Sequence, residues 1–168
     1  CGDWVVTRTS RLTDEQLRQW KSLMALMMAL PPALDAQLKR DCGLNSFEYH
    51  VLARLSDQPA GKLRMSELSA YTQGSPSRLS HAVARLERAG WIERRNAEAR
   101  CVNAHLTEAG RRKLVEAAPA HVREVRRLVI DLLTPEQFDA LGEAARLVVG
   151  QIEPGWMDAM ERNSAGDC

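Results

Sequence analysis

One stretch of sequence decides the fold: Ser-Pro-Ser-Arg-Leu-Ser-His-Ala-Val-Ala-Arg-Leu-Glu-Arg-Ala-Gly, residues 75–90, followed at once by Trp-Ile-Glu-Arg, residues 91–94. Ser75 is a favourable helix N-cap, and Pro76 suits the first turn because the amide that it lacks would be unpaired there. Gly90 is expected to end the helix, since glycine adopts the left-handed conformation at little cost. The stretch therefore predicts one helix with a defined start and end.

The two faces of this helix differ in character. Leu79, Val83 and Leu86 recur at helical spacing and predict a buried face. The opposite face carries short polar side chains, two arginines and a histidine: Ser77, Arg78, Ser80, His81 and Arg85. A helix of this shape fits the major groove of DNA, where the fork of an arginine matches two acceptors of guanine.

If this helix lies in a major groove, its exposed side chains have different expected roles. We expect four of them to reach base edges: Arg78, Ser80, His81 and Arg85. Ser75 and Ser77 lie at the helix N-terminus, where free amides and the helix dipole favour phosphate contacts. The alternative is a solvated helix face with ordinary salt pairs.

A short β-hairpin is predicted directly after the helix. Residues 91–94 and 100–106 are typical of two strands, with residues 95–99 as a polar tip. Arg94, Arg95 and Arg100 are then expected to contact phosphates from the hairpin.

The elements that precede the long helix complete a recognisable order. A helix is predicted from a Ser46 cap to Leu55, and a turn at residues 57–62 follows it. A second, short helix is expected at residues 67–72, with Ser66 as its cap. Helix, short helix, longer helix and hairpin is the order of a winged helix-turn-helix. The expected fold class is mainly α with a small two- or three-stranded β-wing, plus a helical dimerisation region.

Helices are also predicted before this lobe. Thr13 and Gln16 form a capping box that opens a helix with apolar residues at helical spacing. Pro31 and Pro32 are expected to kink or break this helix, because proline lacks an amide donor and clashes with the preceding turn. Gly43 is expected to end it. The Met-rich face of this helix fits core packing or, alternatively, a helix–helix dimer interface.

Two further helices are predicted after the hairpin. Thr107 is expected to cap the first of them, and Pro119 is expected to bend it. Thr134 and Gln137 form another capping box, which opens the last helix. The domains expected on this basis are a first dimerisation helix (12–43), a DNA-binding lobe (44–106), C-terminal dimerisation helices (107–152) and a loosely held tail (153–168).

Composition limits the classes of function. The chain has 168 residues, of which 45% are hydrophobic and 27% charged, as in an ordinary soluble globular protein. Its net charge is only +1, yet residues 78–100 contain six arginines and three glutamates. A basic segment within a slightly acidic remainder fits a DNA-reading face on a neutral body.

Other classes of protein are not favoured. The apolar stretch 23–34 contains two prolines and is too short to span a bilayer, so we expect a cytoplasmic protein without a membrane partner. The cysteines at 1, 42, 101 and 168 show no metal-ligand or disulfide-scaffold spacing. The four histidines lie in no nucleophile, metal or phosphate-loop motif, so neither an enzyme nor a cofactor is expected.

The region from residue 43 to residue 110 resembles the MarR family of bacterial transcriptional regulators. Four segments carry the resemblance: Gly-Leu-Asn-Ser-Phe-Glu-Tyr-His-Val-Leu-Ala-Arg-Leu (43–55), Met-Ser-Glu-Leu-Ser (65–69), Arg-Leu-Ser-His-Ala-Val-Ala-Arg-Leu-Glu-Arg-Ala-Gly-Trp-Ile-Glu-Arg (78–94) and Leu-Thr-Glu-Ala-Gly (106–110). The resemblance implies a homodimer that binds a pseudo-palindromic double-stranded DNA operator and represses transcription. It also implies relief of DNA binding by a small aromatic or phenolic ligand.

The wing departs from the family pattern at one position. The family's wing carries an Asp-x-Arg motif, in which the acid braces the wing and the arginine enters the minor groove. Glu98 and Arg100 stand at these positions, so the acid is one methylene longer and a looser brace is expected. The resemblance implies minor-groove insertion by Arg100 or, alternatively, by Arg95 at the tip.

Two functional features remain open at the level of sequence. Trp20, Met24, Met28, Tyr49 and His50 are candidates to line a ligand cleft, or they are simply buried packing. The alternatives to a ligand-relieved repressor are a winged-helix protein-interaction module and a redox-responsive regulator that uses Cys42 or Cys101.

Overall fold

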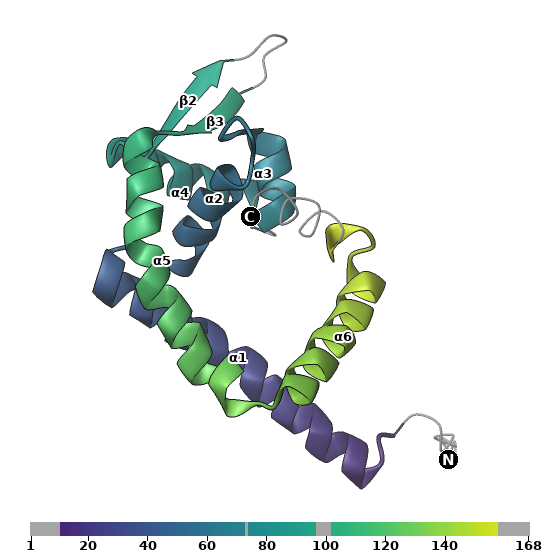
Figure 1. Ribbon diagram of the computed structural model, residues 1–168. Coiled ribbons are helices and arrows are strands. Elements are labelled where there is room, and N and C mark those ends of the chain that lie inside the picture. Colours follow the sequence, from purple (N-terminus) through teal and green to yellow (C-terminus); the bar gives the residue numbers. More distant parts are fainter. Residues whose placement is uncertain (1–10, 73, 97–101, 158–168) are drawn as a thin grey trace, which may run out of the picture. The chain divides into compact units, whose positions relative to one another are not determined.

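The computed structural model describes residues 11–72, 74–96 and 102–157 (Figure 1). The chain forms two compact units, Cys1–Ala33 and Leu34–Cys168, and each is described by itself. Within the described ranges, every helix is too short or too polar to cross a membrane.

Helix α1 spans Asp14–Cys42 without interruption. The predicted capping box at its start is confirmed: the Gln16 amide donates to Thr13 Oγ1 at 3.1 Å, and the Thr13 amide donates to Gln16 Oε1 at 2.9 Å. The expected break at Pro31 and Pro32 is wrong, because both prolines lie inside the helix. Proline's fixed φ is compatible with a helix, and the good helix formers on both sides continue it across the two missing amides.

The second unit contains the remaining helices and strands. They are α2 (Ser46–Ser56), β1 (Lys62–Arg64), α3 (Met65–Thr72), α4 (Pro76–Arg88), β2 (Ile92–Asn96), β3 (Val102–Leu106), α5 (Glu108–Leu128), the 3-10 helix η3 (Ile130–Leu132) and α6 (Pro135–Ile152). The strands form one antiparallel sheet in the order β1-β3-β2. The predicted fold class, mainly α with a small β-wing, is therefore confirmed, with three strands in the sheet.

Two predicted caps are wrong, because both helices begin earlier than expected. Asn45, not Ser46, caps α2: its side chain accepts the Glu48 amide at 2.8 Å, and the Glu48 carboxylate accepts the Asn45 amide at 3.0 Å. Asn and Ser are equally good caps, but only Asn45 has a glutamate three residues on to complete a capping box. Helix α3 begins at Met65, so Ser66 lies inside it.

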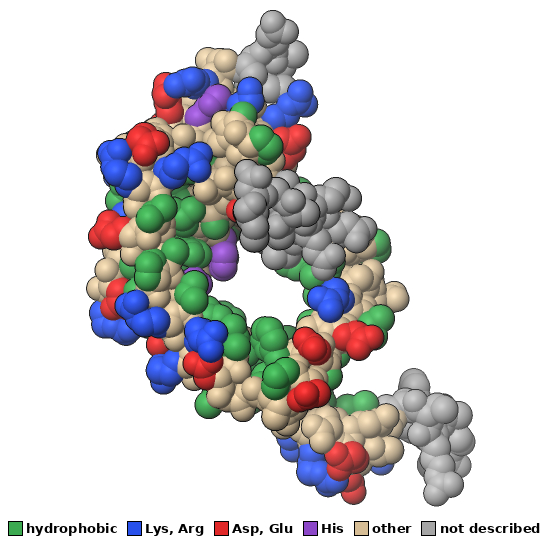
Figure 2. Space-filling model, viewed as in Figure 1, with side chains coloured by type: hydrophobic (Ala, Val, Ile, Leu, Met, Phe, Trp, Pro, Cys, Tyr) green, Lys and Arg blue, Asp and Glu red, His purple; other side chains and the backbone are tan. Residues whose placement is uncertain are grey.

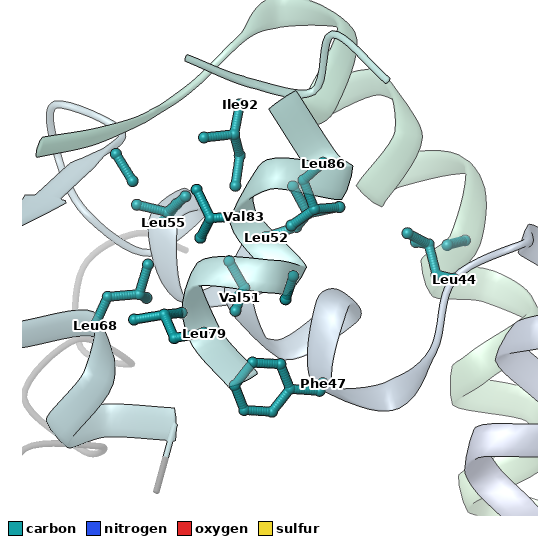
Figure 3. Close-up of a cluster of buried hydrophobic side chains, with 13 residues drawn as sticks. Leu44, Phe47, Val51, Leu52, Leu55, Leu68, Leu79, Val83, Leu86 and Ile92 are labelled. Atoms are coloured by element: carbon teal, nitrogen blue, oxygen red, sulfur yellow. The ribbon is translucent and has the colours of Figure 1, made fainter. Parts of the chain in front are cut away.

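The core of the second unit lies where α2, α3 and α4 meet. Figure 3 shows Val51, Leu52 and Leu55 of α2 directed toward Leu79, Val83 and Leu86 of α4, with Leu68 of α3 beside them. All of these side chains are buried, as the spacing in α4 predicted. Their burial fixes which face of α4 is turned outward.

The helices after the sheet begin as predicted. Thr107 caps α5, and Thr134 and Gln137 form the capping box of α6. Helix α5 runs through Pro119 as one helix. No described residue of α6 is buried, and its exposed apolar side chains are Phe138, Leu141, Leu147, Val148 and Ile152.

Candidate nucleic-acid interface

Helix α4 is held at both ends by local hydrogen bonds. Ser75 Oγ accepts the amide of Arg78 at 3.2 Å, and Pro76 occupies the first turn, as predicted. At the other end Gly90 has a φ of +75°, and the Trp91 amide donates to the Leu86 carbonyl at 2.9 Å. Helix α4 therefore begins and ends at defined residues.

The outward face of α4 is exposed where the sequence predicted it. Its exposed residues are Ser77, Arg78, Ser80, His81 and Arg85. The buried side of the same helix contributes Leu79, Ala82, Val83 and Leu86. The face presents arginine, hydroxyl and imidazole groups to the surroundings, and these are groups that recognise base edges and phosphates.

Arg78 rests on an aromatic platform. Its guanidinium carbon lies 4.4 Å from the centre of the Phe47 ring at the start of α2. Phe47 is itself buried, and its ring also packs against Gly74 in the turn between α3 and α4, where a Cβ would come within 2.6 Å of it. Stacking on a fixed ring limits the conformations of Arg78 and aims its fork away from the core.

Arg85 is held by a different contact. Its Nε lies 2.8 Å from Oε1 of Glu48, and its Nη2 donates to the Gly43 carbonyl at 3.1 Å. Glu48 is only 1% exposed and also completes the α2 capping box with Asn45. Arg85 thus ties α4 to the start of α2.

Replacement of Arg85 by alanine tests this structural role. We expect Arg85→Ala to lower the free energy of unfolding by about 1–2 kcal/mol, because the buried Glu48 carboxylate loses a charged hydrogen-bond donor. Urea unfolding followed by circular dichroism measures the loss. The preference among DNA sequences should stay as in the wild type. A shift in base preference without a loss of stability would contradict the structural role.

The wing is formed by β2 and β3, in the register Ile92 opposite Leu106 to Asn96 opposite Val102. Arg94 Nη2 lies 2.6 Å from Glu87 Oε2 of α4, and hydrogen bonds from Arg94 hold the pKa of Glu87 below its usual range. This pair connects the wing to the end of α4.

Arg95 is also paired, with Glu93 on its own strand at 2.7 Å. Both arginines remain largely exposed, so they can exchange these partners for phosphates. Glu98 and Arg100, the predicted brace and minor-groove arginine, lie outside the described residues. Figure 2 shows Lys and Arg side chains around the end of the lobe that carries the wing.

The predicted ligand-cleft residues fall in both units of the chain. Trp20, Met24 and Met28 lie on α1 in the first unit, where Trp20 and Met28 are exposed. Tyr49 and His50 lie on α2 in the second unit. The Tyr49 ring packs against the His121 ring of α5, with centroids 4.6 Å apart. No single site containing all five residues is described.

Of the two cysteines predicted as redox candidates, Cys42 lies among the described residues. Cys42 lies partly buried at the end of α1, and burial raises the pKa of its thiol. A raised pKa lowers the thiolate fraction and therefore the reactivity. Cys101 lies outside the described residues.

The arrangement defines a class of protein. α2, α3 and α4 surround one core, α4 presents an exposed face with arginines, and a β-hairpin follows it. This is a winged helix-turn-helix lobe.

Comparison with known proteins places the chain in a family. A model described as the MarR family matches residues 43–100. The crystal structure of Sco3205, a MarR family transcriptional regulator from Streptomyces coelicolor in complex with DNA, is 42% identical, with a TM-score of 0.82 over 86% of this chain and 95% of that one. The chain belongs to the MarR family of transcriptional regulators.

Two further relatives agree with this placement. AbsC, a MarR family transcriptional regulator from the same organism, is 36% identical, with a TM-score of 0.80 over 87% of this chain and 98% of that one. The transcriptional repressor MprA of Escherichia coli is 30% identical over 113 residues, 66% of this chain. The match spans 64% of the length of MprA. These relatives are regulators and not enzymes, in agreement with the sequence analysis.

Proposed function

We propose that this protein is a DNA-binding transcriptional repressor that inserts α4 into the major groove and sets the wing against the neighbouring backbone. The observation that carries the proposal is the exposed face of α4, where Arg78 is stacked on Phe47 and directed away from the core. The similarity to Sco3205, which was solved with DNA bound, and to the repressor MprA supports it.

The contacts of each side chain suggest a division of labour. Arg78, Ser80 and His81 are exposed on α4, so we assign them contacts with base edges. Arg78 is in addition restrained by its stacking on Phe47. Ser75 and Ser77 meet phosphates at the helix N-terminus. Arg85 is assigned to holding α4 on α2 rather than to base reading, since Glu48 and the Gly43 carbonyl engage its Nε and Nη2 groups.

The wing is assigned contacts with the DNA backbone. Arg94 and Arg95 are exposed and are paired only with surface glutamates, which phosphates can replace. Arg100 is proposed to enter the minor groove, with Glu98 as the bracing acid, as the resemblance to the family implies.

The proposed repressor is a homodimer, and the apolar side chains that the described residues leave exposed support this part of the proposal. Those on the first unit are Leu12, Leu17, Trp20, Leu23, Leu26, Met27 and Met28. Helix α6 exposes five more, and Figure 2 shows further hydrophobic side chains at the surface along α5. Apolar surfaces of this extent mark interaction sites, and a second copy of the chain is the partner proposed for the helices in 12–43 and 107–152.

Relief of DNA binding by a small aromatic ligand stays a prediction. The organohalide-sensing regulator RdhR was solved with 2,4-dichlorophenol bound, but at 18% identity its likeness concerns the fold alone. The rival functions have less support. The exposed face of α4 lacks the large apolar side chains that a protein-docking surface needs, and the raised pKa of Cys42 disfavours redox sensing there.

The proposal is tested by a gel-shift assay on the DNA upstream of the protein's own gene, over a series of salt concentrations. We expect a retarded complex whose log affinity falls with log salt by about 0.9 for each phosphate contact. Scrambled DNA of equal length is the control. Equal affinity for both DNAs, or an affinity independent of salt, would count against sequence-specific binding.

A further inference from the structure

The residues that follow α6 contact α3 of the DNA-binding lobe. The indole N–H of Trp156 donates to the Tyr71 carbonyl at 3.1 Å, although 85 residues separate the two in sequence. Trp156 is partly buried, and both residues belong to the second unit of the chain. We call this contact between Trp156 and Tyr71 the Trp156 contact.

A tight turn places Trp156 at this position. The Trp156 amide donates to the Glu153 carbonyl at 3.2 Å, and Gly155 has a φ of +83°. Glycine adopts this backbone conformation without the strain that a side chain would cause. Helix α6 ends at Ile152, so the turn connects the Trp156 contact directly to that helix.

The Trp156 contact caps the end of α3. Tyr71 immediately precedes Thr72, the last residue of α3, and the last carbonyls of a helix lack a partner within the helix. The indole supplies the missing donor. The Tyr71 ring is held as well, because the Arg54 guanidinium carbon lies 4.3 Å from its centre. Tyr71 is therefore fixed through both its main chain and its side chain.

The position of this end of α3 matters for the helix that is proposed to read DNA. Ser75 caps α4, and Gly74 lies against the Phe47 ring on which Arg78 stacks. Both residues belong to the short turn between α3 and α4. A shift of the end of α3 would therefore displace the start of α4.

The Trp156 contact also adds an attachment between the lobe and the helices proposed for dimerisation. Helix α5 is attached already, because Ala117 belongs to the core of the lobe and Gly110 lies against the Trp91 carbonyl. Helix α6 has no buried residue among those described, and Trp156 is where the chain beyond its end meets α3. A second attachment restricts rotation of the lobe about the first.

We propose that Trp156 is a positioning residue for operator reading. By holding the end of α3, it fixes the orientation of the lobe relative to α6 and thereby the spacing between the two α4 helices of a dimer. This inference rests on the proposed function, since it requires a dimer that reads two half-sites. Without the Trp156 contact, each lobe rotates more freely and accepts a wider range of half-site spacings.

Hydrogen exchange of the indole N–H, followed by NMR on the full chain without DNA, tests the contact itself. We expect exchange at least about tenfold slower than in N-acetyltryptophanamide, because the hydrogen bond must open first. The signal that is missing from Trp156→Phe identifies the residue. Exchange at the rate of the free amide would overturn the proposal. This measurement needs no DNA, so its failure is distinguishable from failure of the proposed function.

Fluorescence anisotropy on two operators tests the positioning role. One operator has the half-site spacing that the wild type prefers, and the other has one base pair inserted between its half-sites, which rotates them by about 35°. We expect the insertion to weaken wild-type binding at least about tenfold, but binding by Trp156→Ala only about two- to threefold. Trp156→Phe, which keeps a ring but lacks the N–H donor, should lie between them.

The ratio of the two affinities separates positioning from stability. Both affinities come from one preparation, so a fraction of unfolded protein cancels in their ratio. Gln151→Ala, an exposed change in the last turn of α6, is the matched control and should keep the wild-type ratio. Should Trp156→Ala be unfolded, Trp156→Phe carries the test. A wild-type ratio in Trp156→Phe and in a folded Trp156→Ala would overturn the proposal, as would an equal change in Gln151→Ala.

Discussion

Gly110→Ala is expected to lower the free energy of unfolding by about 4 kcal/mol or more, which is a large part of the stability of an ordinary domain. A Cβ at Gly110 would lie 2.1 Å from the Trp91 carbonyl oxygen and 2.8 Å from Leu106 Cδ1. The Trp91 carbonyl also accepts the Thr107 amide at 3.1 Å, so it cannot turn aside without breaking the junction of α5 with the wing. Rotation of a side chain does not relieve a clash with backbone.

Chemical denaturation measures this effect, and Gly150→Ala provides a matched control. Gly150 lies inside α6, and a Cβ there meets nothing within 4 Å. Alanine is the better helix former by about 1 kcal/mol, so Gly150→Ala should be neutral or slightly stabilising. If Gly110→Ala proved as stable as Gly150→Ala, the packing of α5 on Trp91 would be wrong.

Arg78→Ala is expected to weaken binding to a specific operator by about 1–3 kcal/mol, or roughly 5- to 150-fold. The physical reason is the loss of a bidentate base contact from the side chain that Phe47 holds in place. Fluorescence anisotropy on specific and random DNA measures both affinities. The loss should be larger on the specific DNA than on the random DNA.

Two comparisons sharpen the expectation for Arg78. Arg127→Ala removes an exposed arginine of α5 that pairs with Glu124, and it should leave operator affinity unchanged. Phe47→Leu keeps an apolar side chain but removes the ring beneath the guanidinium. It should weaken operator binding when introduced into the wild type but not when introduced into Arg78→Ala. Equal losses on specific and random DNA would assign Arg78 to a phosphate instead.

Local signals explain why α4 could be predicted from the sequence. A serine cap, a proline in the first turn, leucines and a valine at helical spacing and a terminal glycine act within one short segment. Each of these signals acts on its own part of the backbone, and all of them favour the same helix without contacts from distant residues. The caps at Thr13, Thr107 and Thr134 are local in the same way.

Contacts between distant residues could not be predicted in this way. The pair of Arg85 with Glu48 joins residues far apart in sequence and depends on how α4 packs on α2. The strand β1 has only three residues and exists because β3 pairs with it. The stacking of Arg54 on the Tyr71 ring and the hydrogen bond from Trp156 to the Tyr71 carbonyl likewise depend on tertiary structure. The two prolines in α1 show the converse, since a strong local signal was overridden by the helical residues on both sides.

Selection of binding sites from a pool of random double-stranded DNA tests the central claim most directly. Two copies of α4 related by a two-fold axis should enrich an inverted repeat, with half-site centres about 10 base pairs apart or a multiple of this. The same selection with Arg78→Ala should relax the preference at one position in each half-site. Recovery of no common sequence by the wild-type protein, or of a sequence unaltered by Arg78→Ala, would contradict the proposal that α4 reads the operator.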